Sequence, residues 1–313
     1  METFTVALWA VNLARPLNGI EAWAALVEAQ MTEAKAEGAR LLVLPEYACE
    51  QWLCFAPPGL ARDREIAWMA EQGVAALAAV APLARKHGMG LLAGSMPVAR
   101  PVRDAQGEPT GAVEHVNRAW LLLPDGRVTF HDKLVLTPGE MDPAGWNLVP
   151  DDRLRVVEWD DLRLSMLICL DVEMPSLAAR LAGLDIDLLL VPSMTSERSG
   201  YHRVFDCAKA RAVELQTTVC TVGAIGVPVP LAGRDTNISG AAAFTPCEPG
   251  LGHTGVAARL DPLDRVDGPG PMLIARDLPI GAVRRSRRGE AQVWPGAWSA
   301  DHVRIEDPAR GRA

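Results

Sequence analysis

Short apolar runs recur along the whole chain, and stretches with helical periodicity separate several of them. The N-terminal run "FTVALWAV" is followed by residues 20–36, whose apolar residues keep the three-and-four spacing of one helix face. The residues of this face are Trp23, Leu26, Val27, Met31 and Ala34. Strand-like runs that alternate with helices, followed by hairpins, predict an α/β fold in which helices cover a mixed sheet.

Three further helices are expected from the same periodicity. Residues 62–87 read as a long helix that Pro82 could interrupt, because proline lacks the N–H of a helical hydrogen bond. Residues 176–184 and 203–216 are expected to form two shorter helices.

Turn residues predict two connections between strands. "LLLPDGRVTF" indicates a hairpin, because Pro-Asp-Gly supplies turn chemistry between two apolar runs. "TPCEPGLGHTGV" indicates a longer turn between strands 241–245 and 255–260. With no internal repeat, low-complexity linker or break in composition, residues 1–313 are expected to form a single domain. Residues 262–313, rich in Pro, Gly and Arg, are predicted to form an extended C-terminal tail.

Charge and hydropathy exclude several classes of protein. The formal net charge of −8 argues against a nucleic-acid partner, which would require a basic surface. The one basic run, "RRSRR" at 284–288, is better explained as a solvated or subunit-facing segment. The N-terminal "METFTVALWAVN" has no basic n-region, and no apolar stretch is long enough for a membrane helix. We therefore expect a cytoplasmic protein without a membrane partner.

Cysteine and histidine spacing gives no sign of a metal site. The six cysteines include no C-x-x-C pair, and the six histidines are scattered. The sequence "GLGHTG" at 250–255 has the spacing of a dinucleotide-binding loop, but it precedes a strand-like run instead of a helix. We therefore expect no metal and no organic cofactor, and most of the cysteines are expected to be apolar filler.

Three polar residues stand at or near the ends of strand-like runs. "LLVLPE" ends on Glu46, "FHDKLVL" carries Lys133 and "SMLIC" ends on Cys169. In layered α/β proteins, sites collect at the carboxyl ends of strands. A carboxylate, an ammonium and a thiol that met there would be sufficient for acyl transfer.

Each of the three groups has a chemical role in such a reaction. A free thiol has a pKa of roughly 8.5, and a nearby cation or a helix N-terminus favours the reactive thiolate. Glu46 could take the thiol proton and return it to a leaving amine. Lys133 and the backbone N–H of Leu170 could stabilise the negative charge that develops on the substrate oxygen. Taken singly, the three could equally be a strand terminus, a solvated lysine and core filler, so their flanking residues must decide.

With these flanks, the sequence resembles the carbon–nitrogen hydrolase family, also called the nitrilase superfamily, and within it a poorly characterised, amidase-like branch. "LLVLPE" is similar to the family's glutamate motif, "HDKLVLTPGE" to its lysine motif and "ICLDVEMP" to its cysteine motif. The resemblance covers roughly residues 4–260. It implies a four-layer αββα sandwich that assembles into a homodimer or a higher homo-oligomer.

The resemblance also implies roles for individual residues. Glu46 would be the general base, Lys133 the transition-state stabiliser and Cys169 the nucleophile that is acylated. Glu140 matches a second family glutamate, which positions the lysine and the substrate. Four further residues are implied to border the substrate: Tyr47, Ser193, Met194 and Thr195.

The residues after Cys169 indicate which bond is cleaved. Family members that hydrolyse nitriles typically have Cys-Trp-Glu here, whereas this chain has Leu170 and Asp171. Asp171 favours an amidohydrolase acting on a small amide or carbamoyl compound, although Leu170 fits neither pattern. Ser176 stands where the family usually has a glutamate that braces the site.

Three alternatives remain open. The first is a nitrilase that acts on a small nitrile. The second is a catalytically lapsed relative kept as a binding or scaffold protein, for which Leu170 and Ser176 are the only support. The third is a cysteine–histidine dyad of Cys169 with His131, which lies two residues before Lys133 and so on the same strand face.

Overall fold

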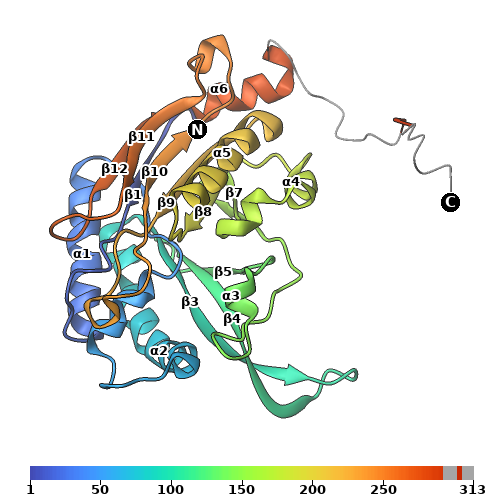
Figure 1. Cartoon of the computed structure of the whole chain (residues 1–313). Coiled ribbons are helices and arrows are strands. Elements are labelled where there is room, and N and C mark those ends of the chain that lie inside the picture. Colours follow the sequence, from blue (N-terminus) through green and yellow to red (C-terminus); the bar gives the residue numbers. More distant parts are fainter. Residues whose placement is uncertain (292–301, 305–313) are drawn as a thin grey trace.

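The computed structural model describes residues 1–291 and 302–304 and contains two six-stranded mixed sheets (Figure 1). The first sheet has the order β12 (Met272–Leu278), β1 (Phe4–Trp9), β2 (Leu41–Val43), β3 (Gly90–Arg103), β4 (Pro109–Leu122) and β5 (Val128–Asp132). The second has the order β11 (Val256–Leu263), β10 (Ser239–Phe244), β9 (Thr218–Gly223), β8 (Leu188–Ser193), β7 (Leu162–Met166) and β6 (Val156–Trp159). The central strands of each sheet are parallel, and antiparallel strands flank them.

Helices cover the outer faces of the two sheets. On the first sheet lie α1 (Ile20–Ala36) and α2 (Arg62–His87), and on the second lie α4 (Pro175–Leu181) and α5 (Arg198–Leu215) (Figure 1). Two further α-helices are short, α3 (Pro138–Met141) and α6 (Ile280–Arg285), and the described residues also include short 3₁₀ helices. Helices outside and two sheets inside make the predicted αββα sandwich, and this prediction is confirmed.

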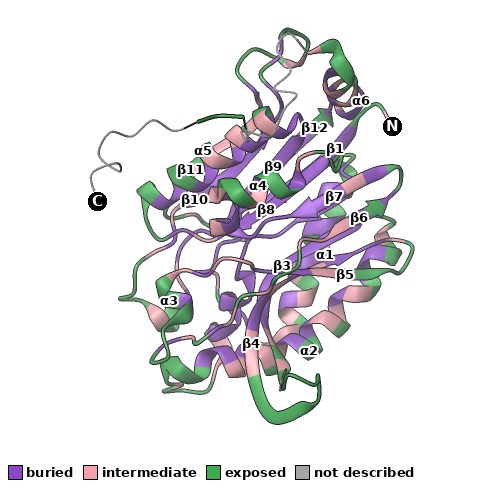
Figure 2. Cartoon of the chain, turned by 90° about the vertical axis from the view of Figure 1, so that its right-hand side faces the viewer, coloured by how far each residue is buried: buried purple, intermediate pink, exposed green. Residues whose placement is uncertain are grey.

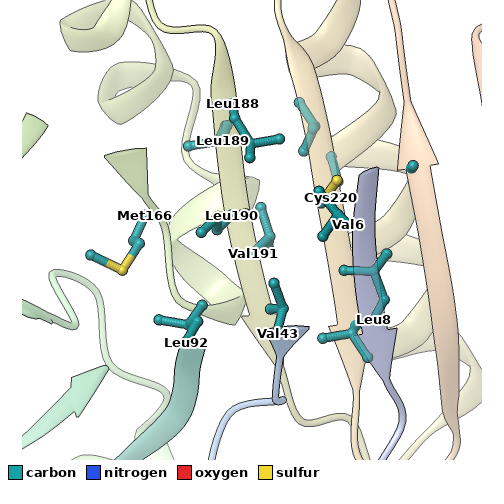
Figure 3. Close-up of a cluster of buried hydrophobic side chains, with 14 of the residues drawn as sticks. Val6, Leu8, Val43, Leu92, Met166, Leu188, Leu189, Leu190, Val191 and Cys220 are labelled. Carbon is teal, nitrogen blue, oxygen red and sulfur yellow. The ribbon is translucent and has the colours of Figure 1, made fainter. Parts of the chain in front are cut away.

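The core lies between the sheets, with a second apolar cluster beneath α1 and α2. Side chains alternate between the two: Val6 and Leu8 face the other sheet, whereas Ala7 and Trp9 face the helices. Figure 3 shows Val6, Leu8, Val43 and Leu92 of the first sheet among residues of β7, β8 and β9. Strands buried on both faces explain why the runs in the sequence are almost continuously apolar (Figure 2).

The predicted helices agree with the structure, apart from their ends. The helix at 20–36 is found with these bounds, and α2 continues through Pro82 without a break. The helix predicted at 176–184 begins at Pro175 and ends at Leu181, and the one predicted at 203–216 begins at Arg198. The hairpin at "LLLPDGRVTF" joins β4 to β5, with Gly126 at φ +93° in its turn.

The prediction of an extended tail from residue 262 is wrong for the part that the structure describes. Residues 272–278 form β12, which pairs antiparallel with β1 and covers what would otherwise be an exposed sheet edge. The helix α6 follows it, and Arg284 and Arg287 of the basic run bind Asp187 at 2.7 and 2.9 Å. The run therefore carries intramolecular ion pairs. Residues 292–301 and 305–313 of the predicted tail lie outside the described residues.

Among residues 1–291 and 302–304, α2 is the one helix long and apolar enough, by length and composition, to span a membrane. Its inner face packs on α1 and β3, and the buried residues on that face include Ile66, Met69, Ala76 and Val80. A core helix of a sandwich meets the same criteria of length and composition.

A close approach of β3 to the loop after β2 sets the position of Glu46. The Ser95 N–H donates to the Pro45 carbonyl at 3.3 Å, and Ser95 Oγ accepts from the Tyr47 N–H at 3.1 Å. Gly94 permits this approach at φ +72°, because a Cβ there would collide with the Pro45 oxygen.

We predict that Gly94→Ala lowers the free energy of unfolding by about 3 kcal/mol, because strain at positive φ and the collision act together. Gly88→Ala is the matched control, since Gly88 has φ +61° but, among the described residues and apart from its neighbours in the chain, no atom lies within 4 Å of its Cβ position. It should cost about 1 kcal/mol, the strain alone. Urea unfolding of both variants tests this, and equal losses would contradict it.

Candidate active site

Three loops from the two sheets bring Glu46, Lys133 and Cys169 together. Glu46 lies three residues after β2, Lys133 directly after β5, and Cys169 opens a short 3₁₀ helix (Cys169–Glu173) after β7. Lys133 Nζ donates to Glu46 Oε1 at 2.8 Å. The side chains are buried, with exposed fractions of 1% for Glu46, 2% for Lys133 and 6% for Cys169.

Glu140 is the second carboxylate around the ammonium. Lys133 Nζ donates to its two oxygens at 2.8 and 2.9 Å. A capping box at the start of α3 fixes Glu140, because its carboxylate accepts from the Thr137 N–H while its own N–H donates to Thr137 Oγ1. The hydroxyl of Tyr47 donates to Glu140 Oε1 at 2.8 Å. Glu140 therefore contacts Lys133, the residue that the family resemblance expects it to position.

Asn117 on β4 belongs to the same hydrogen-bond network, and the sequence analysis does not predict it as a site residue. Its Nδ2 donates to Glu46 Oε1 at 2.9 Å and to Glu140 Oε1 at 3.3 Å. The Lys133 N–H donates to the Asn117 carbonyl at 2.9 Å, so strand pairing sets the two residues side by side. An asparagine inside a strand-like run carries no local signal of such a role.

The buried charges shift one another's pKa values. Burial raises the pKa of Glu46 to about 7, although the Lys133 ammonium acts to lower it. Burial also acts to raise the pKa of Glu140, but Lys133 and the hydrogen bonds from Thr137 and Tyr47 hold it below its usual value. Burial would lower the pKa of Lys133, yet the two carboxylates raise it. The surroundings of Glu140 thus favour its ionised form, whereas those of Glu46 favour its protonated form more than usual.

Cys169 lies in a tight turn at the start of the 3₁₀ helix. Its φ is +49°, a left-handed conformation that costs energy for a residue with a side chain. Its Sγ lies 3.5 Å from the Met194 carbonyl oxygen. Burial and the Glu46 charge raise the pKa of its thiol well above the usual value, against the effect of Lys133. The surroundings of Cys169 therefore favour the neutral thiol over the thiolate.

Asp171 ties the cysteine loop to the lysine loop. One carboxylate oxygen accepts from the N–H groups of Leu134 and Val135 at 3.1 and 2.7 Å, and the other accepts from the Ile168 N–H at 3.0 Å. Asp171 is completely buried. Through these contacts Asp171 holds the segments that carry Lys133 and Cys169 at a fixed separation.

His131 lies beside Asp171, with Nε2 3.8 Å from Oδ2. Within residues 1–291 and 302–304, no hydrogen bond or ion pair joins His131 to Cys169, and neither ring nitrogen has a hydrogen-bond partner. The dyad hypothesis therefore has no contact to support it.

The other residues that the sequence analysis singles out make contacts of different kinds. Leu170 provides one of the first N–H groups of the 3₁₀ helix, which have no partner inside the helix. Ser193 Oγ and Thr195 Oγ1 donate to the carbonyls of Val191 and Ile238, so both hydroxyls are engaged with the backbone. Ser176, which replaces the usual glutamate, is exposed in the first turn of α4.

A cavity of about 370 Å³ adjoins this network. It is lined by Met194, whose carbonyl contacts Cys169, and by Trp146, whose ring packs on Tyr47 with centroids 4.8 Å apart. Of the four predicted substrate-binding residues, Met194 is the one that lines this cavity. In the described part of the chain, His, Cys, Asp and Glu form no group of three that could hold a metal ion.

The model of the carbon–nitrogen hydrolase family matches residues 6–254, so the chain belongs to this family. A probable hydrolase of Bacillus subtilis (strain 168), YhcX, is 28% identical over 172 residues, which are 55% of this chain and 32% of that protein. An (R)-stereoselective amidase of a Pseudomonas species is 29% identical over 151 residues, which are 48% of this chain and 46% of that protein. The matches thus span less than half the length of these two relatives.

Solved structures of an amidase from Nesterenkonia, which belongs to the nitrilase superfamily, are similar over almost the whole chain. One is 26% identical with a TM-score of 0.64, and covers 92% of this chain and 95% of that one. A mutant of that amidase in complex with butyramide is 25% identical with a TM-score of 0.63, at the same coverage.

We predict that Asp171→Asn lowers the free energy of unfolding by about 3 kcal/mol, because an amide cannot accept hydrogen bonds on both sides as the carboxylate does. Asp152→Asn is the control, since the Asp152 side chain is 89% exposed, and it should change stability by less than about 0.5 kcal/mol. Urea unfolding measures both, and a similarly small loss in Asp171→Asn would refute the bracing role.

Proposed function

We propose that the protein is an amidohydrolase that cleaves the C–N bond of a small, non-peptide amide or carbamoyl compound through a thioester on Cys169. The observation that carries the proposal is the Lys133 ammonium, held between Glu46 and Glu140 beside a buried thiol. Membership of the carbon–nitrogen hydrolase family and the amidases among its structural neighbours support it.

In the first half of the reaction, Glu46 takes the thiol proton as Sγ attacks the carbonyl carbon of the substrate. The carbonyl oxygen becomes an oxyanion, which the Lys133 ammonium and the Leu170 N–H stabilise. Glu46 then gives its proton to the leaving nitrogen, the C–N bond breaks, and ammonia or an amine departs from the acyl-enzyme. A base with a pKa of about 7 suits both proton transfers at neutral pH.

In the second half, water replaces the departed amine. Glu46 takes a proton from the water, whose oxygen attacks the thioester carbonyl, and the same two donors stabilise the second oxyanion. The C–S bond then breaks, the sulfur recovers the proton, and a carboxylic acid is released. Glu140 stays ionised throughout and keeps Lys133 charged.

Ammonia release from butyramide tests the assignment of the nucleophile and the base. Cys169→Ala should abolish it, and Glu46→Gln should lower the rate by about 10²–10⁴-fold while leaving the fold intact, because general acid–base help is lost. Turnover by Cys169→Ala would overturn the proposal. Faster acid release from butyronitrile than from butyramide would replace the amidase assignment by a nitrilase.

Fluoroacetamide provides a covalent test, because one structure of the Nesterenkonia amidase carries its acetamide moiety on the active-site cysteine. In Glu46→Gln we expect one acetamide adduct by intact-protein mass: an S–C bond forms, the C–F and S–H bonds break, fluoride leaves and the thiol proton passes to solvent water. The double variant with Cys169→Ala should show none. Cys247, which is exposed, provides the control: Cys247→Ala should leave the adduct in place.

The pH dependence follows from the raised pKa of Glu46. A general base must be ionised, so kcat/KM for a neutral amide should fall as the pH drops below about 7. Glu140 should not add to this limb, because its pKa is lowered. Initial rates between pH 5 and 9 measure the profile. If kcat/KM hardly falls between pH 7 and 5, the base has a pKa nearer the ordinary glutamate value of about 4.3, which would contradict the role given to Glu46.

A further inference from the structure

The cavity beside the catalytic network contains a buried carboxyl group to which the proposed mechanism gives no task. Glu50 lies on the 3₁₀ helix Ala48–Phe55, four residues beyond Glu46, and lines this cavity together with Met194 and Trp146. Its exposed fraction is 7%. Within residues 1–291 and 302–304, its carboxylate makes no hydrogen bond and no ion pair.

The other charged groups that line the cavity are either paired or solvated. Arg234 donates to both oxygens of Glu65, at 2.6 and 3.1 Å. Its charge is therefore paired with a carboxylate that does not line the cavity. Trp146 Nε1 also approaches Glu65, at 3.5 Å. Arg62 and Asp235, of opposite charge, are both exposed. Glu50 is thus the one buried and unpartnered charge among the described residues of this lining.

A carboxylate that is buried without a cationic partner is destabilised relative to one in water. A ligand that supplied the partner would remove part of this cost and would therefore bind there more tightly. Burial raises the pKa of Glu50 to about 7, the Glu65 charge adds to this, and Arg234 opposes it. A cationic group in the cavity would restore the missing partner. A carboxylate on the ligand would instead be repelled, and a purely apolar group would leave Glu50 unsatisfied.

We propose that Glu50 is a specificity-determining residue that binds a cationic amino group on the non-reacting end of a small amide substrate. This inference rests on the proposed function, because it requires the scissile carbonyl to lie at Cys169. The ammonium of the same substrate would then lie in the cavity, whose lining includes Met194 next to Cys169. It narrows the substrate class to amides that carry an ammonium group, such as ω-amino amides.

The test compares 4-aminobutanamide with pentanamide, which differ in that an ammonium replaces the terminal methyl. The specificity ratio is defined as kcat/KM for the amino amide divided by kcat/KM for the neutral one. The wild type should favour the amino amide, and Glu50→Gln should lower the ratio by at least about tenfold, mainly through KM. An unchanged ratio in Glu50→Gln, or a wild type that favours pentanamide, would overturn the inference.

Asp235→Asn is the matched control, because it removes the same charge from an exposed position of the same cavity. Solvent screens such a charge, so the ratio should change by less than about threefold. If Asp235→Asn and Glu50→Gln lower the ratio equally, the preference comes from the overall negative charge near the cavity and not from an ion pair with Glu50. This result would overturn the inference.

The ratio also provides a pH test in which Glu46 cancels, because both substrates depend on the same base. The charges that act on Glu50 are Glu65, Arg234, Glu46 and Arg62. In the wild type the ratio should rise as the pH increases through about 7, since the Glu50 carboxyl then loses its proton. In Glu50→Gln this rise should be absent, and its persistence would overturn the inference.

Direct binding separates the inference from the proposed function. Calorimetry with Cys169→Ala should show tighter binding of 4-aminobutanamide than of pentanamide, and the double variant with Glu50→Gln should lose the difference. This outcome supports the Glu50 site even without turnover, whereas hydrolysis of both amides without any preference would refute the Glu50 site and leave the hydrolase intact.

Discussion

The Lys133 ammonium, enclosed by the carboxylates of Glu46 and Glu140, is the interaction on which the site depends. Removing three such groups from water is costly, and the arrangement persists because hydrogen bonds satisfy them from several sides. Tyr47, Asn117 and Thr137 supply those bonds. The consequence is an asymmetry between two carboxyls of the same type: Glu140 receives most of the donors and stays ionised, while Glu46 is left able to exchange a proton.

The two-sheet architecture makes this enclosure possible. Glu46 and Lys133 follow strands of the first sheet, whereas Cys169 follows a strand of the second, so the site lies where the two sheets meet. Asp171 joins the two loops through backbone N–H groups on both sides. Apolar side chains fill the space between the sheets, so the packed core fixes the strands from which these loops begin, and Asp171 then joins the loops themselves (Figure 3).

Parts of the site could be predicted from the sequence because their neighbours carry a local signal. Glu46 and Cys169 end apolar runs, Lys133 precedes one, and their flanking motifs resemble one family. Asn117 and Glu50 carry no such signal, because their importance arises from what lies beside them in space. Likewise β12 was overlooked because Pro, Gly and Arg surround its short apolar run, and only pairing with β1 makes it a strand.

The sequence by itself determined the class of fold, the helices at 20–36 and 62–87, and the three residue types needed for acyl transfer. These are encoded in spacing and in short motifs, which act over a few residues. The tertiary structure alone decided the directions in which the pKa values of the Cys169 thiol and of Glu46 shift, the contacts of Asp171 and the burial of Glu50. Burial and charge proximity govern these properties, and both depend on segments far apart in the chain.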